Sequence, residues 1–139
     1  MKSPFVIFAL KCSVILYFAA CTGINEYSTA VSATPNVTKG KWKVNLFKEA
    51  SQDMSGELKG YTLTFIPSGK LMVVKDGEII RGNWSEDEIL KRMTIDLETN
   101  DPNLRKLNDQ WNVSVVSKTD VSLQNTKNPN TGRLQITSL

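Results

Sequence analysis

Apolar and polar residues alternate along most of the chain after Gly40, which is the pattern of strands with one buried face. Between Trp42 and Leu46, for example, apolar residues alternate with Lys43 and Asn45. The same alternation recurs in short segments separated by turn sequences. The expected strands are 42–46, 61–65, 71–75, 79–84, 93–97, 111–115, 121–123 and 134–136. A series of short strands with turns between nearly all of them predicts an all-β antiparallel barrel or a sandwich.

Turn and helix signals divide these strands. Asp76-Gly77 is a strong two-residue hairpin signal, and Pro67-Ser68-Gly69 predicts a tight turn. Asp101-Pro102 combines a helix-capping residue with a proline at the first helical position, so we expect one short helix over 102–108. Ser85 to Glu88 has the spacing of a capping box and predicts a single turn between two strands.

The first twenty residues have the features of a signal peptide. Lys2 provides a basic start, and the uninterrupted apolar stretch Cys12 to Ala20 is far shorter than the ~20 residues needed to span a bilayer. The sequence Phe18-Ala19-Ala20-Cys21 resembles the lipobox of bacterial lipoproteins, in which the cysteine is acylated and becomes the first mature residue. An ordinary secretory signal cleaved nearby and an uncleaved anchor helix are the alternatives.

This interpretation divides the chain into three parts. Residues 1–20 are the predicted lipoprotein signal peptide, and 21–39 are a lipidated N-terminus with a flexible tether rich in Ser, Thr, Ala and Asn. Residues 40–139 are the barrel domain. Lipid on Cys21 would hold the protein to the envelope membrane. The segment after Cys21 has no acidic cluster like that of surface-exported lipoproteins. We therefore expect the protein to be anchored in the outer membrane with the domain facing the periplasm. Exposure at the cell surface is the alternative.

Composition excludes several kinds of chemistry. The chain has 139 residues, 17 Lys and Arg, 14 Asp and Glu, two Cys and no His. Without histidine there is no Ser–His–Asp site and no typical catalytic zinc site. Basic residues are scattered, which argues against nucleic acid as a partner. Glu86-Asp87-Glu88 lacks the pattern of a calcium loop, and Asp96 and Glu98 share the outer face of a strand. We therefore expect no enzyme activity, no metal and no cofactor.

Several short motifs occur in an order that carries a family resemblance. These are Gly40-Lys41-Trp42, Gly60 to Phe65, Ser68-Gly69-Lys70, Arg81 to Trp84, and Leu104 to Trp111. Together they resemble the lipocalin-like domain family of small bacterial (Bacteroidota-type) envelope lipoproteins, over about residues 40–138. The resemblance implies an eight-stranded up-and-down barrel on a lipid anchor, and it implies no particular activity because function in that family is mostly unassigned.

One feature of true lipocalins is expected to be missing. In those proteins an arginine on the last strand stacks over the tryptophan of the first strand. In a closed antiparallel barrel the last-strand Arg133 would lie beside Phe47 and Lys48, about 15 Å from Trp42. The comparison with true lipocalins therefore gives weaker support for ligand binding by this protein.

The aromatic residues are the candidate site. Strand parity points at least Trp42, Phe65 and Trp111 inward, and an eight-stranded barrel encloses either a packed core or one small molecule. Two hypotheses follow. The protein binds a small apolar or amphipathic molecule inside the barrel, or it is a protein-interaction module of the envelope with a filled barrel. The sequence does not identify the protein partner of such a module. We expect the filled core. The candidate interior or ligand-lining residues are Trp42, Tyr61, Phe65, Trp84 and Trp111.

Overall fold

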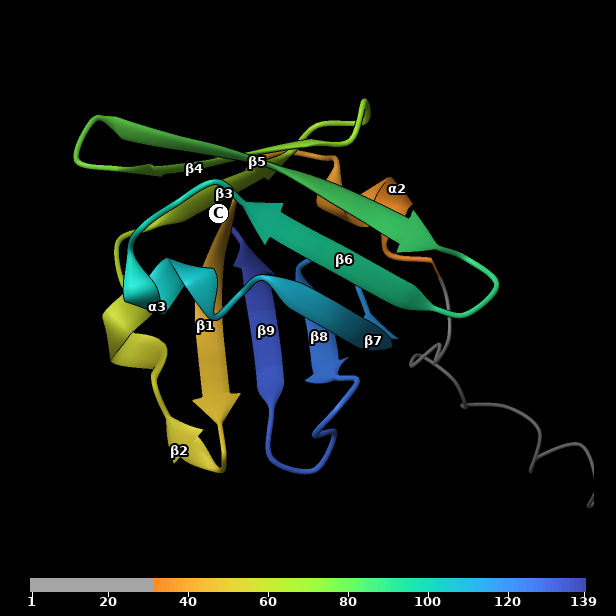
Figure 1. The fold of residues 1–139 in the computed structure, drawn as a ribbon. Coiled ribbons are helices and arrows are strands. Elements are labelled where there is room, and N and C mark those ends of the chain that lie inside the picture. Colours follow the sequence, from red (N-terminus) through yellow and green to blue (C-terminus); the bar gives the residue numbers. More distant parts are fainter. Residues whose placement is uncertain (1–31) are drawn as a thin grey trace, which may run out of the picture.

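The computed structural model describes residues 32–139, in which antiparallel strands close into an up-and-down barrel (Figure 1). Each barrel strand pairs with the next, and β1 pairs with β9 to close the sheet. The barrel strands are β1 (Trp42–Glu49), β3 (Thr62–Phe65), β4 (Lys70–Lys75), β5 (Glu78–Asp87), β6 (Arg92–Leu97), β7 (Asp109–Val116), β8 (Asp120–Asn125) and β9 (Arg133–Ser138). The predicted eight-stranded barrel is confirmed. The predicted signal peptide and Cys21 lie outside the described residues.

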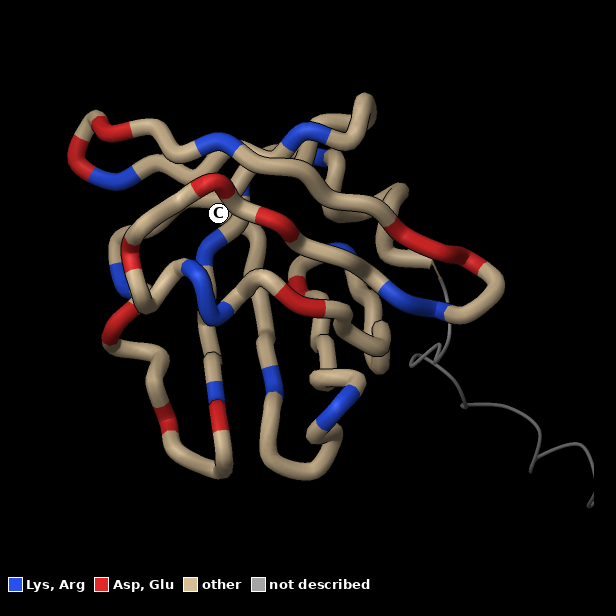
Figure 2. The backbone as a smooth tube through the Cα atoms, in the orientation of Figure 1, with Lys and Arg blue, Asp and Glu red and all other residues tan. Residues whose placement is uncertain are grey.

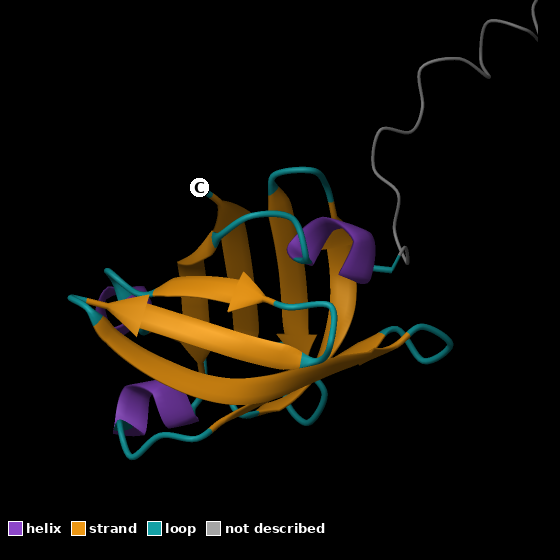
Figure 3. Cartoon of the chain, turned by 90° about the horizontal axis from the view of Figure 1, so that it is seen from above, coloured by secondary structure: helices purple, strands orange, loops and turns teal. Residues whose placement is uncertain are grey.

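Four short elements lie around the barrel. A two-residue strand, β2 (Gln52–Asp53), is added to β1, and a 3-10 helix, η2 (Ser55–Leu58), follows it. The α-helices are α2 (Thr34–Val37) and α3 (Pro102–Arg105). Figure 3 shows the helices at the rims of the barrel rather than across a sheet face. Only one helix was expected from the sequence, because segments this short bury one or two apolar residues each and leave little periodic signal.

Helix α3 begins as predicted. The carboxylate of Asp101 accepts hydrogen bonds from the backbone amides of Asn103 and Leu104, and Pro102 occupies the first turn. The helix ends at Arg105, earlier than the predicted 108. Leu104 and Leu107 are both fully buried, so this segment packs against the core beyond the end of the helix.

The predicted flexible tether extends too far toward the barrel. Within the predicted 21–39 segment, residues 34–37 form α2, and the side chains of Ala33 and Val37 are fully buried. The backbone oxygen of Val37 accepts a hydrogen bond from the indole of Trp42. Burial of these two apolar side chains folds the last part of the segment onto the barrel. The part before residue 32 lies outside the described residues.

Two β-bulges change which side chains face the core. The register of β1 against β9 shifts just before Leu46, and that of β7 against β8 shifts just before Val115. Each extra residue reverses the alternation of side chains beyond it. The buried positions are therefore Phe47 and Val116, and the predicted inward positions of Leu46 and Val115 are wrong.

The hairpins at the two ends of β5 differ in how well the sequence predicts them. Asp76 and Gly77 have φ angles of 51° and 83° and join β4 to β5 in the predicted two-residue turn. The predicted turn over Ser85 to Glu88 is wrong, because β5 continues through Asp87 and Glu86 pairs with Met93 of β6. Strand pairing with β6 overrides the local capping signal.

Candidate functional site

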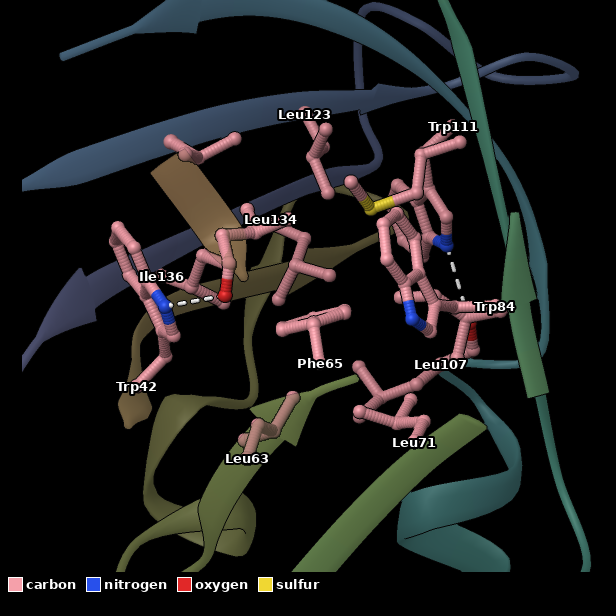
Figure 4. Packing of buried hydrophobic residues seen from close by; sticks show 14 of the residues in the cluster. Trp42, Leu63, Phe65, Leu71, Trp84, Leu107, Trp111, Leu123, Leu134 and Ile136 are labelled. Atoms are coloured by element: carbon pink, nitrogen blue, oxygen red, sulfur yellow. Dashed lines mark hydrogen bonds between the residues drawn. The ribbon is translucent and has the colours of Figure 1, made fainter. Parts of the chain in front are cut away.

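The predicted aromatic site lies inside the barrel for four of its five members. Trp42, Phe65 and Trp111 are each 1% exposed, and Trp84 is 6% exposed. Figure 4 shows these rings among the aliphatic side chains of the facing strands. They belong to one cluster of 22 buried hydrophobic residues, and no polar or charged side chain is buried in the part of the chain that the structure describes.

The indole N–H groups of the three tryptophans are all used by the protein itself. Each donates to a backbone oxygen of a segment at the rim of the barrel: Val37 accepts from Trp42 at 2.9 Å, Ile66 from Trp84 at 2.9 Å, and Leu107 from Trp111 at 3.0 Å. Small-molecule sites pair apolar walls with a few free polar groups that orient the ligand. These indoles have no free donor to offer.

Trp42 also lacks the arginine partner of true lipocalins. It pairs with Ser138 of β9, while Arg133 pairs with Lys48 at the other end of β1. The predicted separation of Arg133 from Trp42 is therefore confirmed. The indole N–H instead donates to the backbone oxygen of Val37 at the end of α2.

The interior aromatic rings pack edge to face. Phe65 and Trp84 have ring centroids 5.4 Å apart at 89°, and Phe47 and Trp111 are 6.4 Å apart at 65°. A hollow of about 120 Å³ reaches the second pair from the end of the barrel that carries α3. This is well short of the ~300 Å³ of the smallest usual ligand pockets.

Tyr61, the fifth predicted residue, lies at the rim and reaches solvent. Its ring packs partly against the core, and the ammonium of Lys75 lies 4.7 Å from the ring centroid. The hydroxyl donates to the carboxylate of Asp101 at 2.9 Å. This hydrogen bond raises the pKa of Tyr61 and, together with the backbone amide of Asn103, lowers the pKa of Asp101. Asp101 therefore stays ionised at neutral pH.

The tyrosine borders an open groove of about 490 Å³ on the outside of the barrel. The groove lies where β6 has ended at Leu97 while β5 continues to the hairpin at Asp76-Gly77. Its walls are the first residues of β5 and the connection from β6 to α3. The lining residues are Tyr61, Glu78, Ile79, Ile80, Arg81, Glu98, Thr99, Asn100 and Asp101.

One edge of β5 is open along this groove. Pairing of β5 with β6 begins at Gly82, and one further hydrogen bond, from the amide of Glu98 to the oxygen of Arg81, extends it by a residue. Backbone groups of alternate residues point to the same neighbouring strand. Ile79 therefore presents its N–H and C=O toward the groove, on the side where no strand of residues 32–139 pairs with it. This edge could not be predicted from the sequence, because the end of a strand depends on how many of its residues pair with the neighbouring strand.

Charge in the groove is mainly negative. Glu78 and Glu98 are exposed at its margins and the ionised Asp101 lies at its inner end, whereas Arg81 and, beside Tyr61, Lys75 supply positive charges. Ile79 is 47% exposed and adds an apolar side chain to the same surface. The groove thus combines a free strand edge, an apolar contact and an acidic rim.

Sequence reasoning also missed the role of Glu86. Its carboxylate accepts hydrogen bonds from the backbone amides of Ala33 and Thr34, each at 2.8 Å, and from the hydroxyls of Ser32 and Thr34. The sequence predicts Glu86 only as part of a turn between two strands, whereas in the structure its carboxylate binds the segment that leads into α2. No local signal could have found the contact, because its partners precede it by more than fifty positions.

Two further observations concern chemistry and membranes. Among residues 32–139 no group of three or more Cys, Asp or Glu side chains is arranged to hold a metal ion. Asp96 and Glu98 are exposed on the outer face, where the sequence placed them. The helices of residues 32–139 are all too short or too polar to cross a membrane.

Comparison with known proteins identifies a fold neighbour. No model of a known protein family matches the chain, and no curated protein matches it either. A crystal structure of a DUF4847 family protein from Bacteroides vulgatus ATCC 8482 is similar, with a TM-score of 0.55 over 76% of this chain and 96% of that chain. The two sequences are 13% identical. This chain therefore shares its barrel fold with that protein, and the similarity extends to the fold alone.

Proposed function

We propose that this protein is a lipid-anchored, non-enzymatic domain of the bacterial cell envelope that binds an extended segment of another protein in the groove beside β5. The single observation that carries the proposal is the combination of a filled interior with an open strand edge outside it. The interior is occupied by a continuous hydrophobic cluster, and the largest hollow described above lies on the outer surface.

The filled interior argues against carriage of a small apolar molecule. A ligand inside the barrel would have to displace side chains such as Phe65 and Trp84, which contact each other in the centre. Emptying a close-packed aromatic position costs about 3–5 kcal/mol, which a small ligand would first have to offset. Binding at the outer surface carries no such cost.

Strand addition fits the geometry of the groove. An extended peptide laid beside Glu78 to Arg81 would complete the backbone hydrogen bonding of Ile79 and continue the sheet where β6 ends. Side chains of the peptide that alternate toward the barrel would contact Tyr61 and Ile80, which pack against the core. The peptide backbone supplies affinity in this mode, and side-chain contacts supply specificity.

The charges of the groove select the chemistry of the peptide. Glu78, Glu98 and Asp101 surround it, so a Lys or Arg side chain on the bound segment would find a carboxylate partner. Exposed ion pairs contribute little to affinity, about 0–1 kcal/mol each, but they favour one partner over another. We therefore propose a basic extended segment as the occupant.

The lipid anchor is the part of the proposal that the sequence supports. Phe18-Ala19-Ala20-Cys21 resembles a lipobox, and acylation of Cys21 would hold the domain at the periplasmic face of the outer membrane. The full chain with Cys21→Ala tests this part. Loss of membrane association together with loss of acyl groups in mass spectrometry supports the anchor, and a processed variant that stays membrane-bound contradicts it.

Binding of synthetic peptides by the full chain tests the groove. We expect extended peptides that contain Lys or Arg to bind saturably and to shift the amide NMR signals of Glu78 to Arg81. Ile79→Lys, which adds a positive charge that repels a basic peptide and removes the apolar contact, should weaken binding at least tenfold. Gln110→Lys on the exposed face of β7 is the matched control and should leave binding unchanged.

An apolar fluorescent probe tests the alternative function. We expect no saturable binding of such a probe to the wild-type protein, because the core is filled. Micromolar binding that quenches tryptophan emission would make carriage of a small molecule the leading function. In the peptide titration, NMR shifts that spread over signals of core residues, rather than over the start of β5, would contradict binding in the groove.

A further inference from the structure

The hairpin that joins β5 to β6 carries two aliphatic side chains at its tip. Ile89 is 90% exposed and Leu90 is 56% exposed. Figure 1 shows this hairpin extending to the right, beyond the ends of the neighbouring strands. Isolated exposed aliphatic residues are common on protein surfaces, so the position and surroundings of this pair decide whether it has a role.

The tip is held in one shape. A carboxylate oxygen of Asp87 accepts hydrogen bonds from the amides of Ile89 at 3.0 Å and Leu90 at 2.9 Å. Lys91 closes the turn with a φ angle of 57°, and its carbonyl accepts a hydrogen bond from the amide of Val113. The turn therefore presents both aliphatic side chains to solvent on a structured support.

The tip lies beside the point where the chain reaches the barrel from its N-terminal segment. The hydroxyl of Ser32 donates to Glu86 at 2.8 Å and to Glu88 at 3.3 Å, on the β5 side of the same hairpin. If residues 21–32 behave as the flexible tether that the sequence predicts, they would span about 20 Å. Lipid on Cys21 would thus keep the hairpin tip within a short distance of the membrane surface.

The same end of the barrel carries charges of both signs. It is formed by α2, the β5–β6 and β7–β8 turns and the C-terminus, which are joined by hydrogen bonds from Asn36 to Ser117 and from Leu139 to Lys41. Exposed basic residues at this end are Lys39, Lys41, Arg92 and Lys118. Acidic residues lie at the tip as well: Glu86 is bound to the α2 segment, Asp87 binds the turn amides, and Glu88 is exposed. Attachment of this end to a membrane therefore depends on the apolar pair and on the nearby incoming chain.

The other end of β5 lies far from the incoming chain. Its hairpin ends in Asp76-Gly77 with Glu78 beside it, and Figure 2 shows this acidic tip at the opposite side of the molecule. With ten residues at ~3.3 Å each, β5 separates the two tips by about 30 Å. The molecule thus has one tip with two exposed aliphatic side chains next to the incoming chain and one polar tip far from it.

We propose that the β5–β6 tip inserts Ile89 and Leu90 into the interfacial region of the membrane that carries the lipid anchor. This inference rests on the anchor proposed for Cys21. Contact through the tip would orient β5 away from the bilayer. The peptide groove beside Ile79 would then face outward from the membrane, where a partner protein can reach it.

The test uses the acylated full chain in vesicles of phosphatidylethanolamine and phosphatidylglycerol. An environment-sensitive fluorophore is attached to Ile89→Cys, and the matched control carries it on Glu78→Cys at the opposite tip. Both positions are exposed, so neither change should disturb the fold, which circular dichroism checks. We expect aqueous iodide to quench the label at 89 at least threefold less than the label at 78. Lipids with a quencher on the acyl chain should quench only the label at 89.

Equal quenching of the two labels by iodide, with no quenching by the modified lipid, would overturn the inference. Protection of the label at 89 only after addition of a soluble protein would also overturn it, in favour of a protein contact. Mass spectrometry of the same samples separates the two proposals. If Cys21 is acylated and the label at 89 stays aqueous, the tip inference alone fails. If Cys21 carries no lipid, the anchor fails and the tip inference fails with it.

Discussion

Glu86 on β5 accepts a hydrogen bond from the backbone amide of Thr34 at 2.8 Å and a second one from its hydroxyl, across 52 positions of sequence. The same carboxylate binds the amide of Ala33. It thereby satisfies backbone donors at the beginning of α2 that the helix itself leaves unpaired. A strand residue thus provides the cap that a residue adjacent to the helix usually supplies, and it fixes the N-terminal segment to the barrel.

Replacement of Glu86 should loosen this segment without unfolding the barrel. Hydrogen bonds to charged groups contribute about 1.5–3 kcal/mol each when buried, and this carboxylate is only partly buried, so we expect Glu86→Gln to cost about 1–2 kcal/mol. Amide hydrogen exchange of residues 33–38 should accelerate while exchange in β7 and β8 stays slow. Glu88→Gln is the control, because Glu88 is exposed and makes a single contact of 3.3 Å with Ser32. Equal effects of the two changes would contradict this role.

The same contact predicts a dependence on pH. Burial alone would raise the pKa of Glu86, but the hydrogen bonds from Thr34, Ala33 and Ser32 outweigh it and lower the pKa below its ordinary value of 4.5. A carboxylate whose pKa is lowered by folding stabilises the fold above its ordinary pKa and loses that contribution as pH falls through the lowered value. The amide NMR signals of Ala33 and Thr34 should therefore titrate below pH 4.5. A midpoint above that value would contradict the hydrogen-bond account, and the transition should be absent in Glu86→Gln.

Gly82 is predicted to tolerate no side chain. It is buried on β5, and a Cβ added there would lie 2.7 Å from the Cα of Leu97 on β6. Backbone cannot move away as a flexible side chain would, so Gly82→Ala should destabilise the protein by about 1–3 kcal/mol. Gly56→Ala is the control, since a Cβ there meets nothing within 4 Å. Chemical denaturation of both variants measures the difference.

The β4–β5 turn should be sensitive to backbone strain alone. Gly77 has a φ angle of 83°, and a Cβ at this position meets nothing within 4 Å. Gly77→Val should lower the free energy of unfolding by about 1–2 kcal/mol, because a β-branched residue is strained in this region of conformation. Gly77→Asn, which adopts positive φ more readily, should cost clearly less. Identical denaturation midpoints for the two variants would mean that conformational strain is not what selects glycine here.

Removal of an interior ring tests whether the core is filled. Trp111 is 1% exposed, packs against Phe47 and donates to the oxygen of Leu107. Trp111→Ala should leave a cavity and cost about 3–5 kcal/mol, as at other close-packed aromatic positions. A much smaller cost would indicate that space for a ligand already exists beside the ring. Ile89→Ala at the exposed hairpin tip serves as the control and should change stability by less than about 0.5 kcal/mol.

Features that depend on neighbouring residues could be predicted from the sequence. Alternation with period two places Trp42, Phe65 and Trp111 inside, and Asp76-Gly77 forms the expected hairpin, because each signal is contained within a few residues. The cap of α3 by Asp101 is local in the same sense. For this reason the barrel and much of its aromatic core follow from the amino-acid pattern.

Other features depend on contacts between distant segments. Bulges exchange Leu46 for Phe47 at the core, because the register of β1 is set by pairing with β9 at the other end of the chain. The open edge at Ile79 exists because Leu97, the last residue of β6, pairs with Gly82, so the residues of β5 before Gly82 extend beyond the end of β6. Pairing lengths of this kind leave no mark on either strand alone.

The N-terminal segment shows the division most clearly. Its sequence, rich in small polar residues, is typical of a flexible tether. For the barrel, by contrast, the sequence by itself determined the alternating strands and most of the turns between them. Tertiary structure decided that residues 33–38 fold, since Glu86 binds the amides of Ala33 and Thr34 and the end of the barrel buries the side chains of Ala33 and Val37. The physical reason is that a short helix cannot form alone and becomes stable when distant groups bind its unpaired donors and bury its apolar face.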